Sequence, residues 1–277
     1  MALLLDILTT AAILYAVAAG LLLIFGVMKI INFAHGAFLT LGAYASLVAA
    51  HLGLPPWGAV PLSVLAGMGA GMVIELMIVR PLYARPLDAI LATWGLGIVI
   101  GQLITLGFGR EVQFVASPVQ GTVSVLGTDY SAYRLMLIGA AAAVGVGMAA
   151  LLTRTRFGLV TRAVIMNEQL ARGLGINSGA VRFVTFSVGA GLGSLAGALI
   201  TPLSSVDPNM GIPWLVNAFM LVMVSGASMA SLLLATLMFG AIQVLLSTYI
   251  SPILGGLAVV VLAAITLRIR PKGFARD

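Results

Sequence analysis

Few side chains in this sequence have the chemistry of a catalytic or metal site. The 277 residues include two histidines, His35 and His51, and no cysteine, so we expect no metal site and no thiolate chemistry. The two lysines, Lys29 and Lys272, lie outside any phosphate-binding Gly-x-x-x-x-Gly-Lys-Ser/Thr loop. The serines at 225–228 are not tied to either histidine, as a serine hydrolase would require. The sequence therefore predicts a protein that is not an enzyme and binds no cofactor of its own.

One polar segment interrupts an apolar stretch, at Asn32, His35 and Gly36. A helix that begins inside a membrane directs free backbone N–H groups into the bundle, where they can bind a carboxylate or an amide carbonyl. These three residues are our candidates for a substrate pathway. The alternative is a bend at the cytoplasmic interface, in which the His35 imidazole only satisfies a backbone carbonyl; for His35 alone this reading is favoured.

Glu75 is the one acidic residue that we expect at membrane depth. A buried carboxylate can bind a cation or relay a proton. Arg80 follows a little more than one helical turn later, however, and we favour an interfacial ion pair between these two side chains.

The polar segment 153–182 lies between two long apolar runs, and its five arginines and one glutamate place it in water. We predict a short helix at 161–172 with Ala163, Met166 and Leu170 on one face and a Glu168–Arg172 ion pair on another. Gly173 and Gly175 would end that helix, and Asn177 or Ser178 would cap the next one. A solvated linker with incidental helicity is the alternative.

The elements that must position these residues are membrane helices. The chain is 61% hydrophobic and 8% charged, with a mean hydropathy of +1.16, whereas soluble domains are about 45–50% apolar and about 25% charged. We predict an all-α polytopic protein, a single domain over 1–277, with nine transmembrane or partly re-entrant helices and eight or ten as alternatives. The predicted runs are 7–28, 37 to about 50, 57–79, 88–108, 133–152, 183–203, 213–225, 229–249 and 253–267. Gly189, Gly193 and Gly197 recur at every fourth position and predict a helix-packing face.

Basic residues predict the topology. With nine passes and the 153–182 loop in the cytoplasm, only Arg110 and Arg134 of the 14 basic residues lie outside. The N-terminus is then outside and the C-terminus, including Lys272 and Arg276, is cytoplasmic. This distribution accounts for the net charge of +6 without a nucleic-acid partner.

Several motifs resemble one transporter family. The motifs are 161–164 and 174–177 with Arg182, the segment 32–36 followed by Leu41-Gly42-Ala43-Tyr44, and Ile74-Glu75 followed by Arg80-Pro81-Leu82. They are similar to branched-chain amino acid permeases of the LivH type, which work with ATP-binding cassette (ABC) ATPases. The resemblance covers essentially the whole chain. The segment 224–229 departs from it, because the family usually has a glycine-richer turn there.

The resemblance implies an ABC importer permease fold in a bacterial inner membrane. It also implies a second related permease, two ATPases that bind ATP and Mg²⁺, and a periplasmic substrate-binding protein. In the family, the loop matching 153–182 docks on the ATPase, which here implies the contact residues Arg162, Ala163, Met166, Glu168, Leu170 and Arg172.

Two alternatives concern the function. The segments 91–95 and 270–274 also look like the urea and short-amide branch of this family, so those substrates are the alternative to branched-chain or other apolar amino acids. A stand-alone secondary transporter or channel is the alternative of another class. It would need ion coupling, for which Glu75 is the one available acid.

Overall fold

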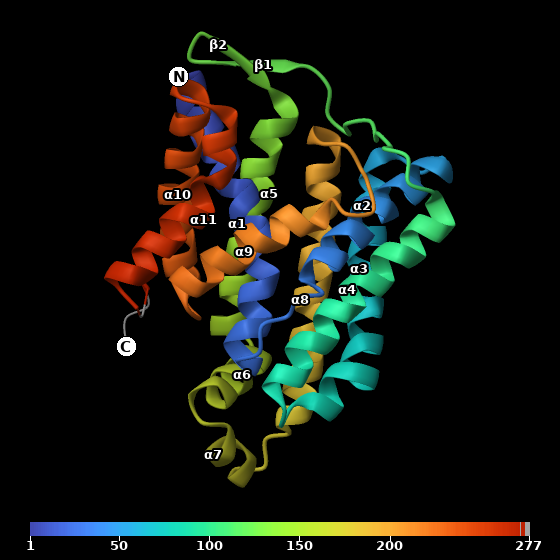
Figure 1. The fold of residues 1–277 in the computed structure, drawn as a ribbon, viewed down its shortest axis with the longest axis vertical. Coiled ribbons are helices and arrows are strands. Elements are labelled where there is room, and N and C mark those ends of the chain that lie inside the picture. The colour runs from blue at the N-terminus through green and yellow to red at the C-terminus, as the bar shows by residue number, and fades with distance from the viewer. Residues whose placement is uncertain (272, 275–277) are drawn as a thin grey trace.

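The computed structural model describes residues 1–271, 273 and 274, which form a bundle of long helices with one two-stranded sheet (Figure 1). The helices are α1 (Ala2–Met28), α2 (His35–His51), α3 (Ala59–Ile74), α4 (Pro86–Phe108), α5 (Ala132–Arg154), α6 (Arg156–Met166), α7 (Glu168–Gly173), α8 (Ser178–Ile200), α9 (Gly211–Ser225), α10 (Met229–Tyr249) and α11 (Pro252–Ile269). Short 3-10 turns are η1 (Pro56–Gly58), η3 (Arg80–Leu82) and η4 (Thr201–Leu203), and η2 (Glu75–Val79) is a π-helical turn. Lys272 and Arg276 of the predicted basic tail lie outside the described residues.

All nine predicted apolar segments are helical, and two of them are short. Within the described residues, seven helical stretches are long and apolar enough to cross a membrane. The other two are α2, with 17 residues, and α9, with 15 residues. At about 1.5 Å per residue both are shorter than the roughly 30 Å hydrocarbon core of a bilayer. The prediction of nine transmembrane or partly re-entrant helices is therefore confirmed.

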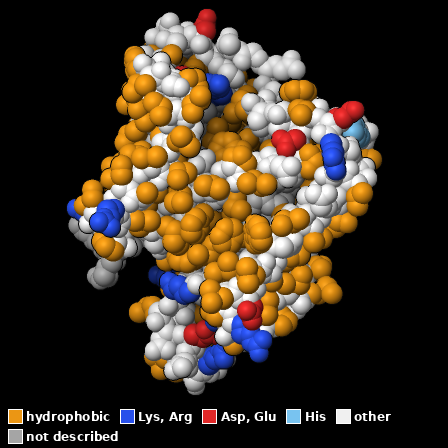
Figure 2. All heavy atoms as spheres, viewed as in Figure 1, with side chains coloured by type: hydrophobic (Ala, Val, Ile, Leu, Met, Phe, Trp, Pro, Cys, Tyr) orange, Lys and Arg blue, Asp and Glu red, His pale blue; other side chains and the backbone are white. Residues whose placement is uncertain are grey.

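Two helices form the centre of the bundle. In the most apolar part of each stretch, 83% of the residues of α1 and 67% of those of α8 are buried, against 17% for α4 and for α5. The outer helices therefore expose apolar side chains, as expected of surfaces that face lipid or a partner subunit. Figure 2 shows apolar side chains across the middle of this face of the bundle, with most charged groups toward its ends and one basic cluster at the left edge.

Glycines allow the central helices to approach closely, as the 189–193–197 pattern predicted. A methyl group at Gly20 of α1 would lie 2.5 Å from the backbone oxygen of Gly189, and one at Gly197 would overlap the Leu39 carbonyl of α2. Such small residues permit backbone contact between helices in a membrane. The predicted packing face is confirmed.

The two ends of the bundle differ. The N-terminus and an antiparallel hairpin, β1 (Thr122–Val125) and β2 (Thr128–Ser131), lie at one end, and α6 and α7 project from the other (Figure 1). The hairpin was not predicted; it lies in the polar stretch between α4 and α5. At this end Asp6 of α1 forms an ion pair with Arg134 of α5 at 2.8 Å and accepts a hydrogen bond from Tyr130 of β2.

Candidate functional site

The predicted pathway residues lie deep in the bundle. After α1 ends, Lys29 adopts a left-handed conformation with φ 55° and the chain turns back, so that α2 begins partway along α1 (Figure 1). His35 is fully buried, and its Nε2 donates a hydrogen bond of 2.8 Å to the carbonyl of Val17, near the middle of α1. Because a carbonyl only accepts, Nε2 carries the hydrogen in the neutral imidazole, and Nδ1, which has no partner among the described residues, is the acceptor nitrogen. The imidazole thus does satisfy a carbonyl, although in the bundle interior and not at the interface.

Asn32 stabilises the turn just before α2. Its Oδ1 accepts a hydrogen bond from the backbone N–H of Ala34 at 3.1 Å, and the N–H of Phe33 donates to Thr93 of α4 at 3.2 Å. These backbone donors, which a bound carboxylate could have used, are therefore already paired. The amide Nδ2 of Asn32 is buried and has no hydrogen-bond partner in the part of the chain that the structure describes.

Gly36 is the point where the two short helices meet. A methyl group at Gly36 would lie 2.9 Å from the carbonyl oxygen of Gly211 and 3.1 Å from Cβ of Leu215, both in α9. Thr40 joins the same two helices, because its hydroxyl donates to the Gly36 carbonyl and accepts from the Gly211 N–H, each at 3.2 Å. Thus α2 and α9 begin side by side within the bundle.

The structure brings Asn32, His35 and Gly36 together around the start of α2, packed against α1, α4 and α9. Four pockets among the described residues are all lined by other side chains. A substrate route past these three residues would require the helices to separate, and this role stays a prediction. Sequence reasoning missed Gly211 and Thr40, although the Asp207-Pro208-Asn209 turn marks the start of α9.

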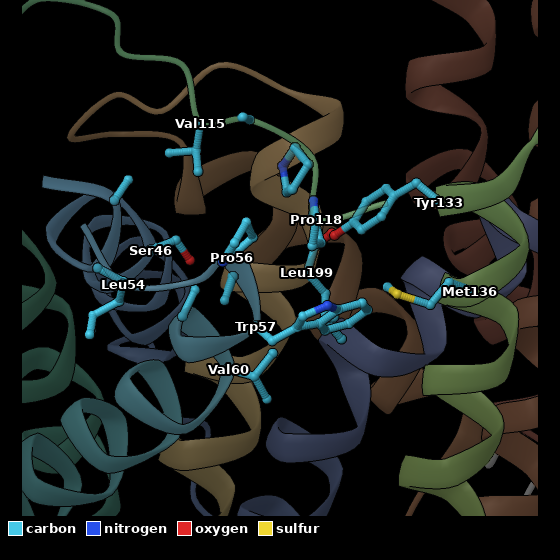
Figure 3. Close-up of a pocket in the computed structure, with 16 residues that line it drawn as sticks. Ser46, Leu54, Pro56, Trp57, Val60, Val115, Pro118, Tyr133, Met136 and Leu199 are labelled. Carbon is cyan, nitrogen blue, oxygen red and sulfur yellow. The ribbon is translucent and has the colours of Figure 1, made fainter. Parts of the chain in front are cut away.

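A partly open pocket of about 90 Å³ lies at the hairpin end of the bundle, opposite α6 and α7 (Figure 3). Apolar side chains dominate its wall; they come from α2, η1, α3, α5, α8 and the loop before the hairpin, and include Trp57 of η1 and Leu199 of α8. Two polar groups at this pocket are already paired, because the Tyr133 hydroxyl donates to the Leu199 carbonyl at 2.7 Å and Ser46 donates to the Gly42 carbonyl at 3.2 Å. The pocket is therefore suited to an apolar group.

The predicted single helix at 161–172 is wrong in its bounds. Two helices, α6 and α7, are separated at Asn167, whose extended backbone ends α6 and whose side chain accepts a hydrogen bond from the N–H of Leu170 at 2.9 Å to cap α7. An Asx cap of this kind competes with helix continuation. Asn177 likewise caps α8, as one of the two predicted alternatives.

The helix break separates the predicted apolar face. Met166 is 86% exposed and Leu170 is 62% exposed, whereas Ala163 packs against the core beside the buried Val164. Two further apolar side chains of the segment are exposed, Leu159 at 63% and Leu174 at 74%. The exposed apolar surface of α6, α7 and the turn after α7 is therefore made by Leu159, Met166, Leu170 and Leu174, and the exposed Arg162 lies on the same segment.

Glu168 makes more contacts than predicted. The expected pair with Arg172 is present at 2.7 Å, and the second carboxylate oxygen of Glu168 accepts from Arg182 of α8. Arg172 also donates to the Ser178 hydroxyl at 2.7 Å. Glu168 is therefore part of a network that ties α7 to α8, and not one half of a solvated pair.

Glu75 forms the ion pair with Arg80 that the sequence favoured. Its carboxylate is fully buried and accepts hydrogen bonds from Arg80 at 3.0 and 3.2 Å and from the hydroxyl of Tyr83. Burial, followed by the hydrogen bond to Glu75, raises the pKa of Tyr83, so the phenol stays a donor. Tyr83 had no recognisable signal in the sequence, and Arg182 was noted only as part of the family motif, because neither belongs to a local pair.

Comparisons with known proteins agree with this architecture. A family model described as branched-chain amino acid transport system / permease component matches residues 3–269. The high-affinity branched-chain amino acid transport system permease protein BraD of Pseudomonas aeruginosa is 25% identical over 253 residues, which cover 84% of this chain and 81% of BraD. The corresponding LivH protein of Escherichia coli (strain K12) is 26% identical over 274 residues, which cover 93% of this chain and 89% of LivH.

A solved structure has the same fold. The chain resembles one titled "PsaBC from Streptococcus pneumoniae in complex with Fab" with a TM-score of 0.53 and 16% identity, over 98% of this chain and 93% of the solved one. At that identity the likeness concerns the fold alone. Since the family match spans nearly all of the helical bundle, the chain belongs to the family of branched-chain amino acid transport permease components, and it is a multi-pass membrane permease.

Proposed function

We propose that this chain is the membrane-spanning subunit of an ATP-driven importer for branched-chain or related apolar amino acids. It would lie in a bacterial inner membrane beside a second, related permease, receive substrate from a periplasmic binding protein and be driven by two ATPases. The printed names of the relatives BraD and LivH support the substrate class. ATP and Mg²⁺ would bind to the ATPases.

The charge distribution supports an orientation with α6 and α7 in the cytoplasm. Arginines 154, 156, 162, 172 and 182 belong to that end, together with Arg80 and Arg85. Cytoplasmic loops carry an excess of basic residues. The N-terminus, at the opposite end, would face the periplasm, and the C-terminus the cytoplasm.

The observation that carries the proposal is the exposed apolar surface of α6, α7 and the following turn. These helices project from the bundle (Figure 1). The protein core does not cover Met166, Leu170 or Leu174. Short helices that present apolar anchors in a polar surrounding typically insert into a groove of a partner. In the proposed complex the partner is the ATPase, and the surrounding arginines form the rim of the contact.

Co-purification tests this assignment. Met166→Asp would place an unpaired charge in the contact, so we expect ATPase recovery to fall by about tenfold or more, which corresponds to about 1.4 kcal/mol. Gln169→Asp is the matched control, because it adds the same charge to an exposed polar position of α7. If Met166→Asp retains the ATPase as well as the Gln169→Asp variant does, the docking assignment is wrong.

Two alternatives have distinct outcomes. Urea and short amides would be the substrates if they compete with leucine for uptake in reconstituted vesicles, whereas we expect competition only from apolar amino acids. A secondary transporter would take up substrate without any ATPase. Against that class, the carboxylate of Glu75 is neutralised by Arg80 at 3.0 Å, which leaves it poorly placed to bind a coupling ion.

A further inference from the structure

A continuous network of side-chain contacts joins the docking helix α7 to the C-terminal end of α3. Glu168 of α7 binds Arg182 of α8, whose guanidinium carbon lies 4.4 Å from the centroid of the Tyr83 ring. The hydroxyl of Tyr83 donates to Glu75, which is also held by Arg80. Three parts of the sequence, α7, α8 and the continuous stretch from η2 through η3 to Tyr83, therefore meet through these side chains.

Most of the side chains in this network are shielded from water. The Glu75 side chain is 0% exposed, that of Arg182 is 13% exposed and that of Glu168 is 27% exposed. Shielded ion pairs and cation–π contacts are stronger and less screened than those on an open surface. Without Arg182, Glu168 would keep only Arg172, whose side chain is 59% exposed, and the shielded contact between α7 and α8 would be lost. The contacts therefore hold α7 in one position relative to the bundle.

At α3, the network reaches an irregular turn of the helix. Glu75 begins the π-helical turn η2, which interrupts the regular helix of α3 before η3. Such turns are rare and occur mostly as single insertions in α-helices, frequently at functional sites. The turn lies where the network enters α3.

Close packing then links α3 and α8 to α2, near the place where the short helices α2 and α9 meet. A methyl group at Gly71 of α3 would lie 2.6 Å from Cβ of Ala190 in α8. Farther along α8, the hydroxyl of Ser194 donates to the carbonyl of Phe38 in α2 at 2.7 Å. A displacement of α7 is thus connected, through α8 and its contacts with α3 and α2, to the residues around His35.

We propose that Tyr83 and Arg182 are positioning residues that couple the docking helix to α3 and α8, so that movement of a bound ATPase reaches the membrane helices. The inference rests on the proposed function, because it requires an ATPase on α6 and α7. It adds that the strength of the Tyr83–Arg182 contact determines how much substrate moves per ATP, independently of how tightly the ATPase binds.

The test uses the full complex in proteoliposomes and measures substrate transported per ATP hydrolysed. Tyr83→Leu and Arg182→Gln should lower this ratio about fivefold or more, the low end of free-energy coupling between two sites, while ATPase recovery stays at the parental level. Arg182→Lys keeps the positive charge and should recover part of the ratio. Arg268→Gln, which changes an exposed arginine of α11, is the control and should equal the parent.

The outcomes separate this inference from the proposed function. If the parent chain does not retain an ATPase, the proposed function fails and the inference falls with it. If the parent retains it but both variants transport as much per ATP as the parent, only the inference is overturned. Loss of the ATPase from Tyr83→Leu and Arg182→Gln would also overturn it, because the contact would then support the docking surface itself.

Discussion

A methyl group added at Gly67 tests how tightly α3 must approach α8. On this helix, Cβ of an alanine at 67 would lie 2.5 Å from Cβ of Ser194 and 2.7 Å from the carbonyl oxygen of Ala190. Carbon atoms in contact are ordinarily about 3.5–4.0 Å apart, so the two helices must separate by about 1 Å. Gly69→Ala, two residues away on the same helix, is the matched control, because its methyl group meets nothing within 4 Å.

The magnitude follows from two losses. Overpacking of this kind costs about 1–3 kcal/mol. Loss of the Ser194 hydrogen bond to Phe38, 2.7 Å in the structure, adds about 0.5–1.5 kcal/mol. Replacing glycine by alanine in a helix recovers up to about 1 kcal/mol in both variants. We therefore expect Gly67→Ala to be less stable than Gly69→Ala by about 2–4 kcal/mol.

Thermal unfolding in detergent, followed by tryptophan fluorescence, measures the difference. At about 2–4 °C per kcal/mol for chains of 150–250 residues, the Tm of Gly67→Ala should lie about 4–16 °C below that of Gly69→Ala. Uptake by the complex should fall in the same variant, because the contact between α3 and α8 supports the place where α2 and α9 meet. Equal Tm values for the two variants would refute the close approach of α3 and α8.

Three further predictions concern the pathway, the buried ion pair and the topology. Gly36→Leu should abolish uptake while the complex still assembles, because the side chain fills the contact with α9; normal uptake would leave Gly36 with a packing role only. Arg80→Gln should destabilise the protein more than Glu75→Gln does, by about 1–3 kcal/mol in unfolding free energy, and should therefore have the lower Tm. The reason is that Arg80→Gln leaves a buried carboxylate without its ion-pair partner, whereas Glu75→Gln leaves an arginine that is 44% exposed; the reverse order of Tm values would contradict this. A cysteine introduced at Gln169 should react with an impermeant maleimide only in inverted vesicles, and Ser124→Cys in intact cells with a permeable outer membrane. Labelling of Gln169→Cys from outside would reverse the orientation.

Local patterns in the sequence determined the membrane helices and several of their details. Apolar runs of about 20 residues predict membrane helices wherever they occur, because their side chains have no other favourable surroundings. The Asn177 cap, the Glu168–Arg172 pair at i, i+4 and the Glu75–Arg80 pair are likewise contacts between near neighbours in the chain. Helix geometry alone brings such residues together, and sequence reasoning therefore found them.

Contacts between distant residues were decided by the tertiary structure. His35 lies against Val17 because the chain turns back after α1, and Gly36 meets Gly211 because α9 begins at the same depth as α2. Arg182 reaches both Glu168 and Tyr83 only once α7, α8 and the end of α3 have assembled. Which side chains of α6 face inward also depends on context, since Ala163 and Val164 pack against the core while Met166 is exposed. Periodicity describes one helix at a time, whereas these positions depend on how several helices share one interior.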